Sequence, residues 1–310
     1  MVQQPTMSKL RRIDVKAGFQ CNNRCRFCVQ GDKRSQFPDK TTVEVKALLT
    51  AGRRDADELV LTGGEITIRD DLPELVRHAR DLGFRVIQLQ TNGRMLSHRP
   101  FVERLQAAGV TEFGPAIHGP TAAIHDELTR SPGSFRQTVK GVRQVKRLGL
   151  PVIVNSVIVQ ANVSHLPELA RLLVALEVDQ FQFAFVHALG SAAESFATIV
   201  PRLSEVGPQV TQALGIGLRA GVRCMTEAIP LCFLPGMEEL AAEAIIPRTK
   251  IFDADQVIDD YTEFRLQEGK AKGPRCPQCR YDAECEGPWR EYPEHFGWEE
   301  FEPVTRRDDG

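Results

Sequence analysis

Three cysteines near the N-terminus have the residue type and spacing of a metal-cluster site, because Cys21, Cys25 and Cys28 form the pattern C-x3-C-x2-C. Cysteine thiolates bind soft metals and iron–sulfur clusters. Three thiolates on one loop can each bind a different iron of a four-iron cluster, which leaves the fourth iron without a protein ligand. A zinc site needs a fourth Cys or His close by, but the nearest histidine, His78, lies 50 residues beyond Cys28. The spacing therefore favours an iron–sulfur cluster with one iron open for chemistry.

The elements that must position this loop alternate between strand-like and helix-like segments over roughly the first two hundred residues. Strands are predicted at 12–19, 58–62, 84–90, 112–118, 151–159 and 181–186. Helices are predicted at 41–54, 72–82, 134–148, 165–176 and 204–214, with Gly83 ending the second and Ser134 capping the third. Such alternation predicts an α/β fold in which helices cover the outer face of a parallel sheet. Six βα units are fewer than the eight of a closed barrel, so we expect a partial, TIM-like (βα)6 barrel.

The alternating pattern ends near residue 216. Residues 218–232 have the character of a short extended segment before a proline-bounded turn, and a charge-rich passage then leads to a second group of cysteines. We therefore expect a barrel domain over residues 1–215 and a small C-terminal domain over residues 216–310.

The composition is that of a soluble globular enzyme, with 310 residues, 42% hydrophobic and 26% charged. The net charge of −2 gives no global reason to expect a nucleic acid or an anionic membrane as partner. No apolar stretch reaches the ~20 residues of a membrane span, and the N-terminus lacks the apolar region of a signal peptide. Eight cysteines without an export signal indicate metal binding rather than disulfides. We expect a cytoplasmic protein with no membrane partner.

Polar residues follow the predicted strands at their C-terminal ends, where parallel sheets bind ligands. After the second strand, Gly63 and Gly64 let the backbone approach a ligand, and Glu65 can receive an ammonium group. The other candidate binding residues are Asn92, Asn155 and Ser156, and the candidate catalytic residues are His118 and His187. Structural alternatives remain, since Asn92 can simply form a turn and Asn155 can be a satisfied core amide.

The N-terminal cysteine pattern resembles the cluster motif of the radical SAM (S-adenosylmethionine) superfamily. The resemblance implies that Cys21, Cys25 and Cys28 hold a [4Fe–4S] cluster, and that the amine and carboxylate of SAM chelate its open iron. It implies that Phe27 lies near the adenine and that Gly63-Gly64-Glu65 corresponds to the GGE motif that binds the SAM amino group. The asparagine and serine candidates are then placed to meet the ribose or carboxylate of SAM. His118 is placed to face SAM or substrate, and His187, just past the sixth strand, to line the substrate cavity. A partial barrel is also implied, in agreement with the strand pattern.

The second cysteine group resembles part of a known auxiliary-cluster motif. Cys276, Cys279 and Cys285 match the start of the C-x2-C-x5-C-x3-C pattern of SPASM domains, but Trp289 stands where the fourth cysteine would be. The resemblance then implies the shorter twitch domain, with one auxiliary [4Fe–4S] cluster and a fourth ligand from upstream. Cys232 is favoured for that ligand, and Cys224 is its competitor. A structural zinc site built from the same cysteines is the alternative.

The resemblance implies an enzyme that reductively cleaves SAM to a 5′-deoxyadenosyl radical, which abstracts hydrogen from a substrate. The outcome would be oxidation, cyclisation or cross-linking during maturation of a peptide or a small metabolite. The electron for SAM cleavage would come from an external reductant such as flavodoxin or ferredoxin. A nucleic-acid substrate is not favoured, because the sequence lacks basic clusters. The alternatives are a non-enzymatic carrier with two clusters, and a radical SAM core joined to a structural zinc domain.

Overall fold

The computed structural model describes residues 11–305, and its six predicted strands are all present. They are β1 (Arg12–Lys16), β2 (Glu58–Thr62), β3 (Val86–Thr91), β4 (Glu112–Pro115), β5 (Ile153–Ile158) and β6 (Gln180–Phe185). In β1 buried and half-buried residues alternate, with Ile13 and Val15 fully buried. Successive strand residues face opposite sides, so Arg12, Asp14 and Lys16 share the face opposite these two core residues.

The predicted helices are also present, and sequence reasoning missed two others of eight or more residues. The predicted ones are α2 (Thr42–Gly52), α3 (Leu72–Asp81), α6 (Ser134–Arg147), α7 (Leu166–Ala175) and α10 (Leu203–Arg219). The two that were missed are α4 (Arg99–Ala108) and α5 (Ala122–Thr129). Shorter helices are α1 (Lys33–Gln36), α8 (Ser191–Glu194), α9 (Phe196–Ile199), α11 (Tyr261–Phe264) and α12 (Glu291–Phe296).

The start of α6 is stabilised by Asp126, in α5, rather than by the predicted cap Ser134. The Asp126 carboxylate accepts the N–H groups of Gly133 at 2.6 Å and Phe135 at 2.7 Å, and the Ser134 hydroxyl at 2.8 Å. Burial opposes ionisation of Asp126, but these hydrogen bonds outweigh it and lower the pKa of the carboxyl. The prediction for Ser134 was therefore wrong, because the acceptor lies eight residues away in the preceding helix.

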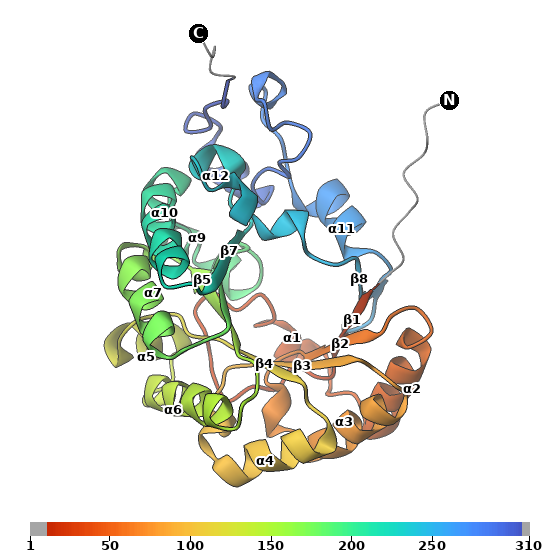
Figure 1. The fold of residues 1–310 in the computed structure, drawn as a ribbon. Helices are drawn as coiled ribbons and strands as arrows, with labels where there is room; N and C mark the ends of the chain where they lie inside the picture. The colour runs from red at the N-terminus through yellow and green to blue at the C-terminus, as the bar shows by residue number, and fades with distance from the viewer. Residues whose placement is uncertain (1–10, 306–310) are drawn as a thin grey trace.

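The strands form a curved parallel array with the order β8-β1-β2-β3-β4-β5-β6-β7 (Figure 1). Parallel bridges between Phe113 and Val152 and between Ala116 and Asn155 join β4 to β5. Helices α2, α3, α4, α6, α7 and α10 lie on the outside of this ring (Figure 1). This is the partial-barrel α/β fold predicted from the sequence, with two further parallel strands.

The two additional strands come from beyond the predicted domain boundary. They are β7 (Arg223–Glu227), which pairs with β6, and β8 (Thr249–Phe252), which pairs with β1 and is followed by the antiparallel β9 (Val257–Ile258). Helix α10 also runs through residue 216. Within residues 11–305, β7 and β8 are not hydrogen-bonded to each other or joined by another strand, so the ring stays open between them. C-terminal segments lie over this opening (Figure 1). The division at residue 216 stays a prediction.

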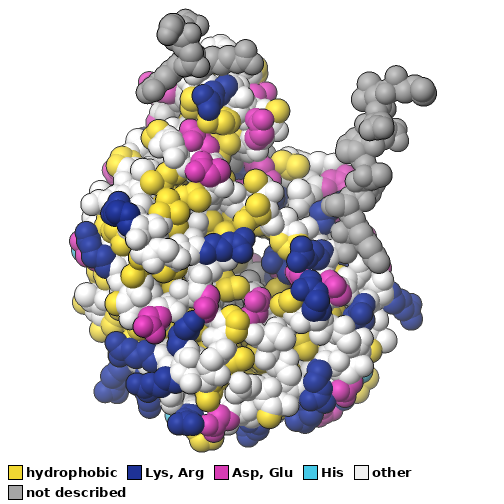
Figure 2. All heavy atoms as spheres, viewed as in Figure 1, with side chains coloured by type: hydrophobic (Ala, Val, Ile, Leu, Met, Phe, Trp, Pro, Cys, Tyr) yellow, Lys and Arg dark blue, Asp and Glu magenta, His cyan; other side chains and the backbone are white. Residues whose placement is uncertain are grey.

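The ring surrounds a hollow, and Lys and Arg side chains lie around its opening in the view along the strands (Figure 2). Of the helices in residues 11–305, none combines the length and the apolar character that crossing a bilayer would require.

Candidate active site

The three N-terminal cysteines line one pocket at the C-terminal ends of the strands. Cys21, Cys25 and Cys28 follow β1 directly, and the same pocket is lined by residues from the ends of β2, β3, β4 and β5, which include Thr62, Gly64, Gln90, Asn92, Ala116, His118 and Asn155. The backbone N–H of Asn23 donates to the Cys21 sulfur at 3.3 Å. The structure thus brings the predicted cluster ligands and several predicted SAM contacts to one place.

Two arginines that sequence reasoning missed hold the cysteine loop. Arg94, after β3, donates to Asn22 O, to Asn23 Oδ1 at 3.0 Å and to Gln137 Oε1 at 2.6 Å. Arg34 donates to Asn23 O at 2.8 Å and lies 4.0 Å from the Cys28 sulfur. Neither arginine belongs to a recognisable sequence motif, since each acts on a partner distant in sequence or through the backbone.

The Gly63-Gly64 turn approaches the backbone that leads from β1 to Cys21. A Cβ on Gly63 would lie 2.1 Å from the carbonyl oxygen of Gly18, and Gly63 has a φ of +136°. The Gly64 N–H donates to that same oxygen at 2.8 Å, and Glu65 N–H donates to Gln20 O at 2.8 Å. The two glycines are therefore required for the cysteine loop to lie against the end of β2.

Glu65 is buried and joins β2 to β3. Its Oε1 accepts hydrogen bonds from the N–H and the hydroxyl of Thr67, the N–H at 2.9 Å. The same Oε1 accepts the Thr91 hydroxyl at 2.5 Å, and Oε2 accepts the Asn92 N–H at 2.6 Å. Oε2 thus keeps one lone pair, although the residue is only 2% exposed and Gly64, not Glu65, lines the pocket. The contact between Glu65 and the SAM amine stays a prediction.

The two polar residues of β5 point in opposite directions. Asn155 lines the pocket, and its Oδ1 is buried without a hydrogen-bond partner. Ser156 is fully buried on the other face, where its hydroxyl donates to Ile117 O at 2.6 Å. Adjacent residues of a strand cannot both face one ligand, so the structure brings Asn155 to the pocket and leaves Ser156 outside it.

Asn92 lines the pocket and also contacts the cysteine loop. Its Nδ2 donates to Asn22 Oδ1 at 2.6 Å and lies 3.9 Å from the Cys21 sulfur. Its Oδ1 accepts the Arg94 N–H at 3.0 Å. Asn92 therefore forms the predicted turn and still has its amide beside a cysteine.

His118 lines the pocket, and Phe27 packs against it edge to face with ring centroids 4.7 Å apart. Burial, with a smaller contribution from His125, lowers the pKa of His118 to about 3, so the ring is neutral at physiological pH. Its Nδ1 accepts the Val157 N–H at 3.2 Å, which leaves the ring proton on Nε2. The side chain can therefore donate a hydrogen bond at Nε2, but it is not suited to take up a proton.

The thiols of the pocket fit a cluster that binds them as thiolates. Burial raises the pKa of Cys25 to about 12, with further contributions from Cys28 and Cys21. A thiol of this kind stays protonated until a metal displaces the proton. The orphaned acceptor of Asn155 and the N–H that points at Cys21 also suit a polar ligand and a sulfur-bound metal.

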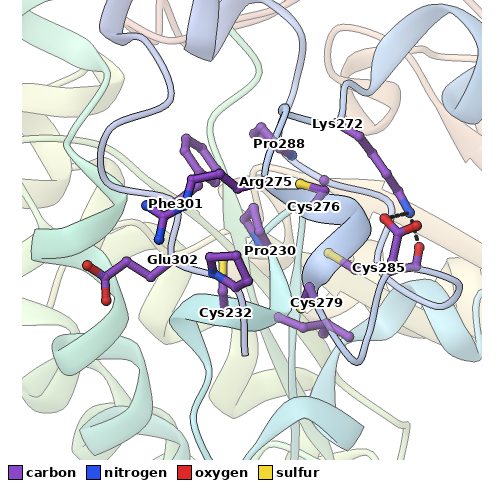
Figure 3. A pocket seen from close by; sticks show the side chains of 14 residues that line it. Pro230, Cys232, Lys272, Arg275, Cys276, Cys279, Cys285, Pro288, Phe301 and Glu302 are labelled. Carbon is purple, nitrogen blue, oxygen red and sulfur yellow. Dashed lines mark hydrogen bonds and ion pairs between the residues drawn. The ribbon is translucent and has the colours of Figure 1, made fainter. Parts of the chain in front are cut away.

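The C-terminal cysteines line a second pocket together. Cys276, Cys279 and Cys285 surround it with Cys232, which lies in the turn after β7 (Figure 3). Cys224 is elsewhere: it is a buried β7 residue whose thiol lies 3.5 Å from Leu214 O in α10. In the described chain, no three His, Cys, Asp or Glu side chains are arranged as ligands of a single metal ion.

His187 does not line the cysteine pocket. Its ring stacks on Trp289 with centroids 3.9 Å apart, and its Nε2 lies 3.4 Å from Glu291 Oε2. The role of His187 in lining a substrate cavity stays a prediction.

Comparison with known proteins supports the same interpretation. The radical SAM superfamily model matches residues 15–173, just over half of the chain. The AdoMet-dependent heme synthase of Oleidesulfovibrio alaskensis is 29% identical over 197 residues, covering 62% of this chain and 47% of that protein. The pre-heme d1 synthase of Dinoroseobacter shibae is 34% identical over 163 residues, covering 52% of this chain and 40% of that protein. The chain thus spans about half the length of the curated relatives it matches.

The fold also resembles a solved structure. SuiB of Streptococcus suis, bound to S-adenosylmethionine, superposes with a TM-score of 0.67 at 14% identity, covering 91% of this chain and 73% of SuiB. At this identity the likeness concerns the fold alone. The segment that matches the superfamily model begins in β1, contains the three cysteines and extends into α7. On this evidence the chain belongs to the radical SAM superfamily.

Proposed function

We propose that this protein cleaves SAM reductively and uses the resulting 5′-deoxyadenosyl radical to remove hydrogen from a substrate C–H bond. The observation that carries the proposal is the convergence of three thiols, the Gly64 backbone and the unpartnered Asn155 Oδ1 on one pocket. The names of the two relatives favour maturation of a cofactor such as heme. A peptide substrate, and oxidation, cyclisation or cross-linking as the outcome, remain within the proposal.

The proposed roles of the pocket residues follow from their hydrogen-bonding capacity. A [4Fe–4S] cluster bound to Cys21, Cys25 and Cys28 would supply the electron and one open iron for SAM. Asn155 Oδ1 would accept a hydrogen bond from SAM, and the Gly64 backbone, which lines the same pocket, would lie beside it. His118, neutral and protonated at Nε2, would orient SAM or substrate as a hydrogen-bond donor. Phe27, which packs edge to face against the His118 ring, would fix the orientation of that ring.

We also propose that Cys232, Cys276, Cys279 and Cys285 bind one auxiliary [4Fe–4S] cluster. Four thiols would fill the ligand positions of all four irons, so the cluster would pass electrons and not bind substrate directly. An external one-electron reductant, such as flavodoxin or ferredoxin, would supply the N-terminal cluster. The cytoplasm is the compartment in which both clusters would stay reduced.

The test is anaerobic incubation of the reconstituted full chain with SAM and dithionite, followed by measurement of 5′-deoxyadenosine. We expect product from the unchanged protein and from the matched control Cys224→Ser, and none from Cys28→Ala. The same preparations should contain about eight irons per chain, four for each cluster. Eight irons without 5′-deoxyadenosine would support an electron carrier instead. About four irons and one zinc would support the structural zinc domain.

A further inference from the structure

Three lysine side chains converge on one aspartate at the end of β1 and β8. Lys16 Nζ lies 2.5 Å from Asp253 Oδ2, and Lys33 Nζ lies 2.8 Å from Asp253 Oδ1. Lys40 Nζ donates to the backbone oxygens of Asp253 at 2.7 Å and Ala254 at 3.2 Å. The Asp253 side chain is 5% exposed, and those of Lys16 and Lys33 are 17% and 23% exposed. The charges therefore lie largely out of water.

These charges do not balance. Two ammonium groups share the single Asp253 carboxylate, while the third is held by backbone carbonyls. Asp14 also acts on Lys16, but Asp14 already has a cationic partner, because its Oδ1 lies 3.3 Å from Arg12 Nε. Glu44 and Asp255 act on the third lysine. A half-buried surplus of positive charge is costly unless an anion compensates for it.

The surplus charge lies beside the cysteine pocket. Lys16 is the last residue of β1 and is paired in register with Thr62, which lines that pocket together with Gln90 and Asn155. Lys33 begins α1, five residues after Cys28. Its neighbour in sequence, Arg34, faces the pocket, whereas Lys33 is directed at the end of β8. The two lysines thus lie at the same edge of the ring as the proposed SAM site, where ligands of parallel barrels bind.

We propose that Lys16 and Lys33 bind an anionic group of the substrate, either a carboxylate or a phosphate. This inference rests on the proposed function and adds a substrate class to it. Asp253 holds the two ammonium groups together, and the incoming anion neutralises the charge that Asp253 leaves uncompensated. Lys33 and Lys40 lie 5.7 Å and 5.9 Å from the centre of the Phe19 ring, which supports them from one side.

Lysine labelling measures occupancy of this site directly. The reconstituted full chain is acetylated with a water-soluble acetylating reagent, and each lysine is quantified by peptide mass spectrometry. The probes are inorganic phosphate and succinate, each compared with sodium chloride at equal ionic strength. At an anion concentration of about twice its Kd, a lysine that reacts only in the empty site is modified about threefold more slowly. We expect this protection at Lys16 and Lys33 and not at Lys140, which is exposed on α6.

Substitutions connect the protection to the pair of lysines. Lys33→Gln removes one ammonium group and should abolish the protection of Lys16, whereas the matched control Lys140→Gln should leave it unchanged. Protection by phosphate alone would identify a phosphate-bearing substrate, and protection by succinate alone would identify a carboxylate-bearing one. Both results support the proposal.

The labelling also separates the substrate from SAM, which carries a carboxylate of its own. If SAM alone protects both lysines and neither probe adds to this, the site belongs to SAM and the proposal is overturned. Equal rates with every probe, or equal protection by chloride, would overturn it too. Labelling requires no SAM cleavage, so a protein that forms no 5′-deoxyadenosine still reports on the lysines. Formation of 5′-deoxyadenosine by a protein with unprotected lysines would leave the proposed function intact and remove this inference.

Discussion

The indole of Trp289 lies flat on the imidazole of His187, with ring centroids 3.9 Å apart and planes inclined by 5°. Lys270 Nζ is 4.2 Å from the centre of the same indole. Trp289 stands where the SPASM pattern has its fourth cysteine. Here it joins the C-terminal region to His187, two residues after β6 ends at Phe185. The position of a metal ligand in the SPASM pattern is thus occupied here by a side chain that packs the C-terminal region against the barrel.

Replacing this indole should destabilise the whole chain. Trp289 is 6% exposed, and a buried tryptophan exchanged for alanine costs about 3–5 kcal/mol. Trp289→Ala should therefore lower the free energy of unfolding, measured with urea, by that amount. Trp289→Phe keeps an aromatic ring and should lose clearly less. Equal stability of the alanine variant and the unchanged protein would contradict a supporting role for this stack.

Gly63→Ala should lower the free energy of unfolding by more than backbone strain alone explains, because the added Cβ would clash with the cysteine loop. The added Cβ would lie 2.1 Å from Gly18 O, at a φ of +136°. Gly149 is a matched control, because its φ is +73° and a Cβ there would meet no atom within 4 Å. Gly149→Ala should cost about 1–3 kcal/mol for the strained backbone. Gly63→Ala should cost more and should also lower the iron content, which Gly149→Ala should leave unchanged.

Removal of the Arg94 guanidinium should loosen the loop that carries the cysteines. Arg94→Met loses hydrogen bonds to Asn22, Asn23 and Gln137, and hydrogen bonds of a charged group contribute about 1.5–3 kcal/mol each. We expect fewer irons at the N-terminal site after reconstitution and slower formation of 5′-deoxyadenosine. The control is Arg99→Met, because Arg99 forms an exposed ion pair within α4. The same iron content in both variants would argue against this role for Arg94.

The free energy of unfolding should fall as the pH falls below about 6.5, because two histidines are buried in the neutral form. Burial lowers the pKa of His118 to about 3 and that of His125 to about 4. Between these values and the unfolded pKa near 6.5 the unfolded chain binds more protons, so each histidine removes about 1.4 kcal/mol of stability per pH unit. This contribution is complete above about pH 6.5 and is lost progressively toward pH 4.

Urea unfolding of the metal-free full chain at about pH 7 and about pH 5 measures this slope. His125→Gln should make the slope shallower and keeps an acceptor for the His118 N–H, which donates to His125 Nδ1 at 3.1 Å. His98 is exposed, and His98→Gln should leave the slope as it is. An unchanged slope in His125→Gln would show that this ring titrates alike in the folded and unfolded chain.

Cys232 and Cys224 should differ in their effect on iron content. Cys232 shares a pocket with Cys276, Cys279 and Cys285, whereas Cys224 is in the core beside α10. Cys232→Ser should therefore lower the iron content by up to about four per chain. Cys224→Ser should keep the full content. Loss of iron from Cys224→Ser alone would make Cys224 the fourth auxiliary ligand.

The sequence predicted those features whose signals are local. The six βα units could be found because strand alternation and helical periodicity are read over short windows. The cysteine loop and the glycine turn could be found because their spacing is itself the signal. The same kind of local reasoning could have predicted that Asn155 and Ser156 face opposite sides of the sheet, since neighbouring strand residues do so.

Features that depend on distant partners could not be predicted. Strand β8 has only four residues, and it is recognisable as a barrel strand only through its pairing with β1. Asp126 caps α6 from the preceding helix, and Arg94 acts on a loop 71 and 72 residues away. Their side chains carry no periodic or motif signal, because their role is decided by tertiary contacts.

The pairing of β8 with β1 has a consequence for how this protein folds during synthesis. Lys16 and Asp253 lie side by side although 237 positions separate them in sequence. While the ribosome makes the chain, β1 has one unpaired edge until β8 emerges, and long-range pairing of this kind slows folding. An unpaired strand edge is prone to aggregation in the meantime. A truncation before residue 249 would expose that edge permanently, so the barrel and the C-terminal region should fold as one cooperative unit.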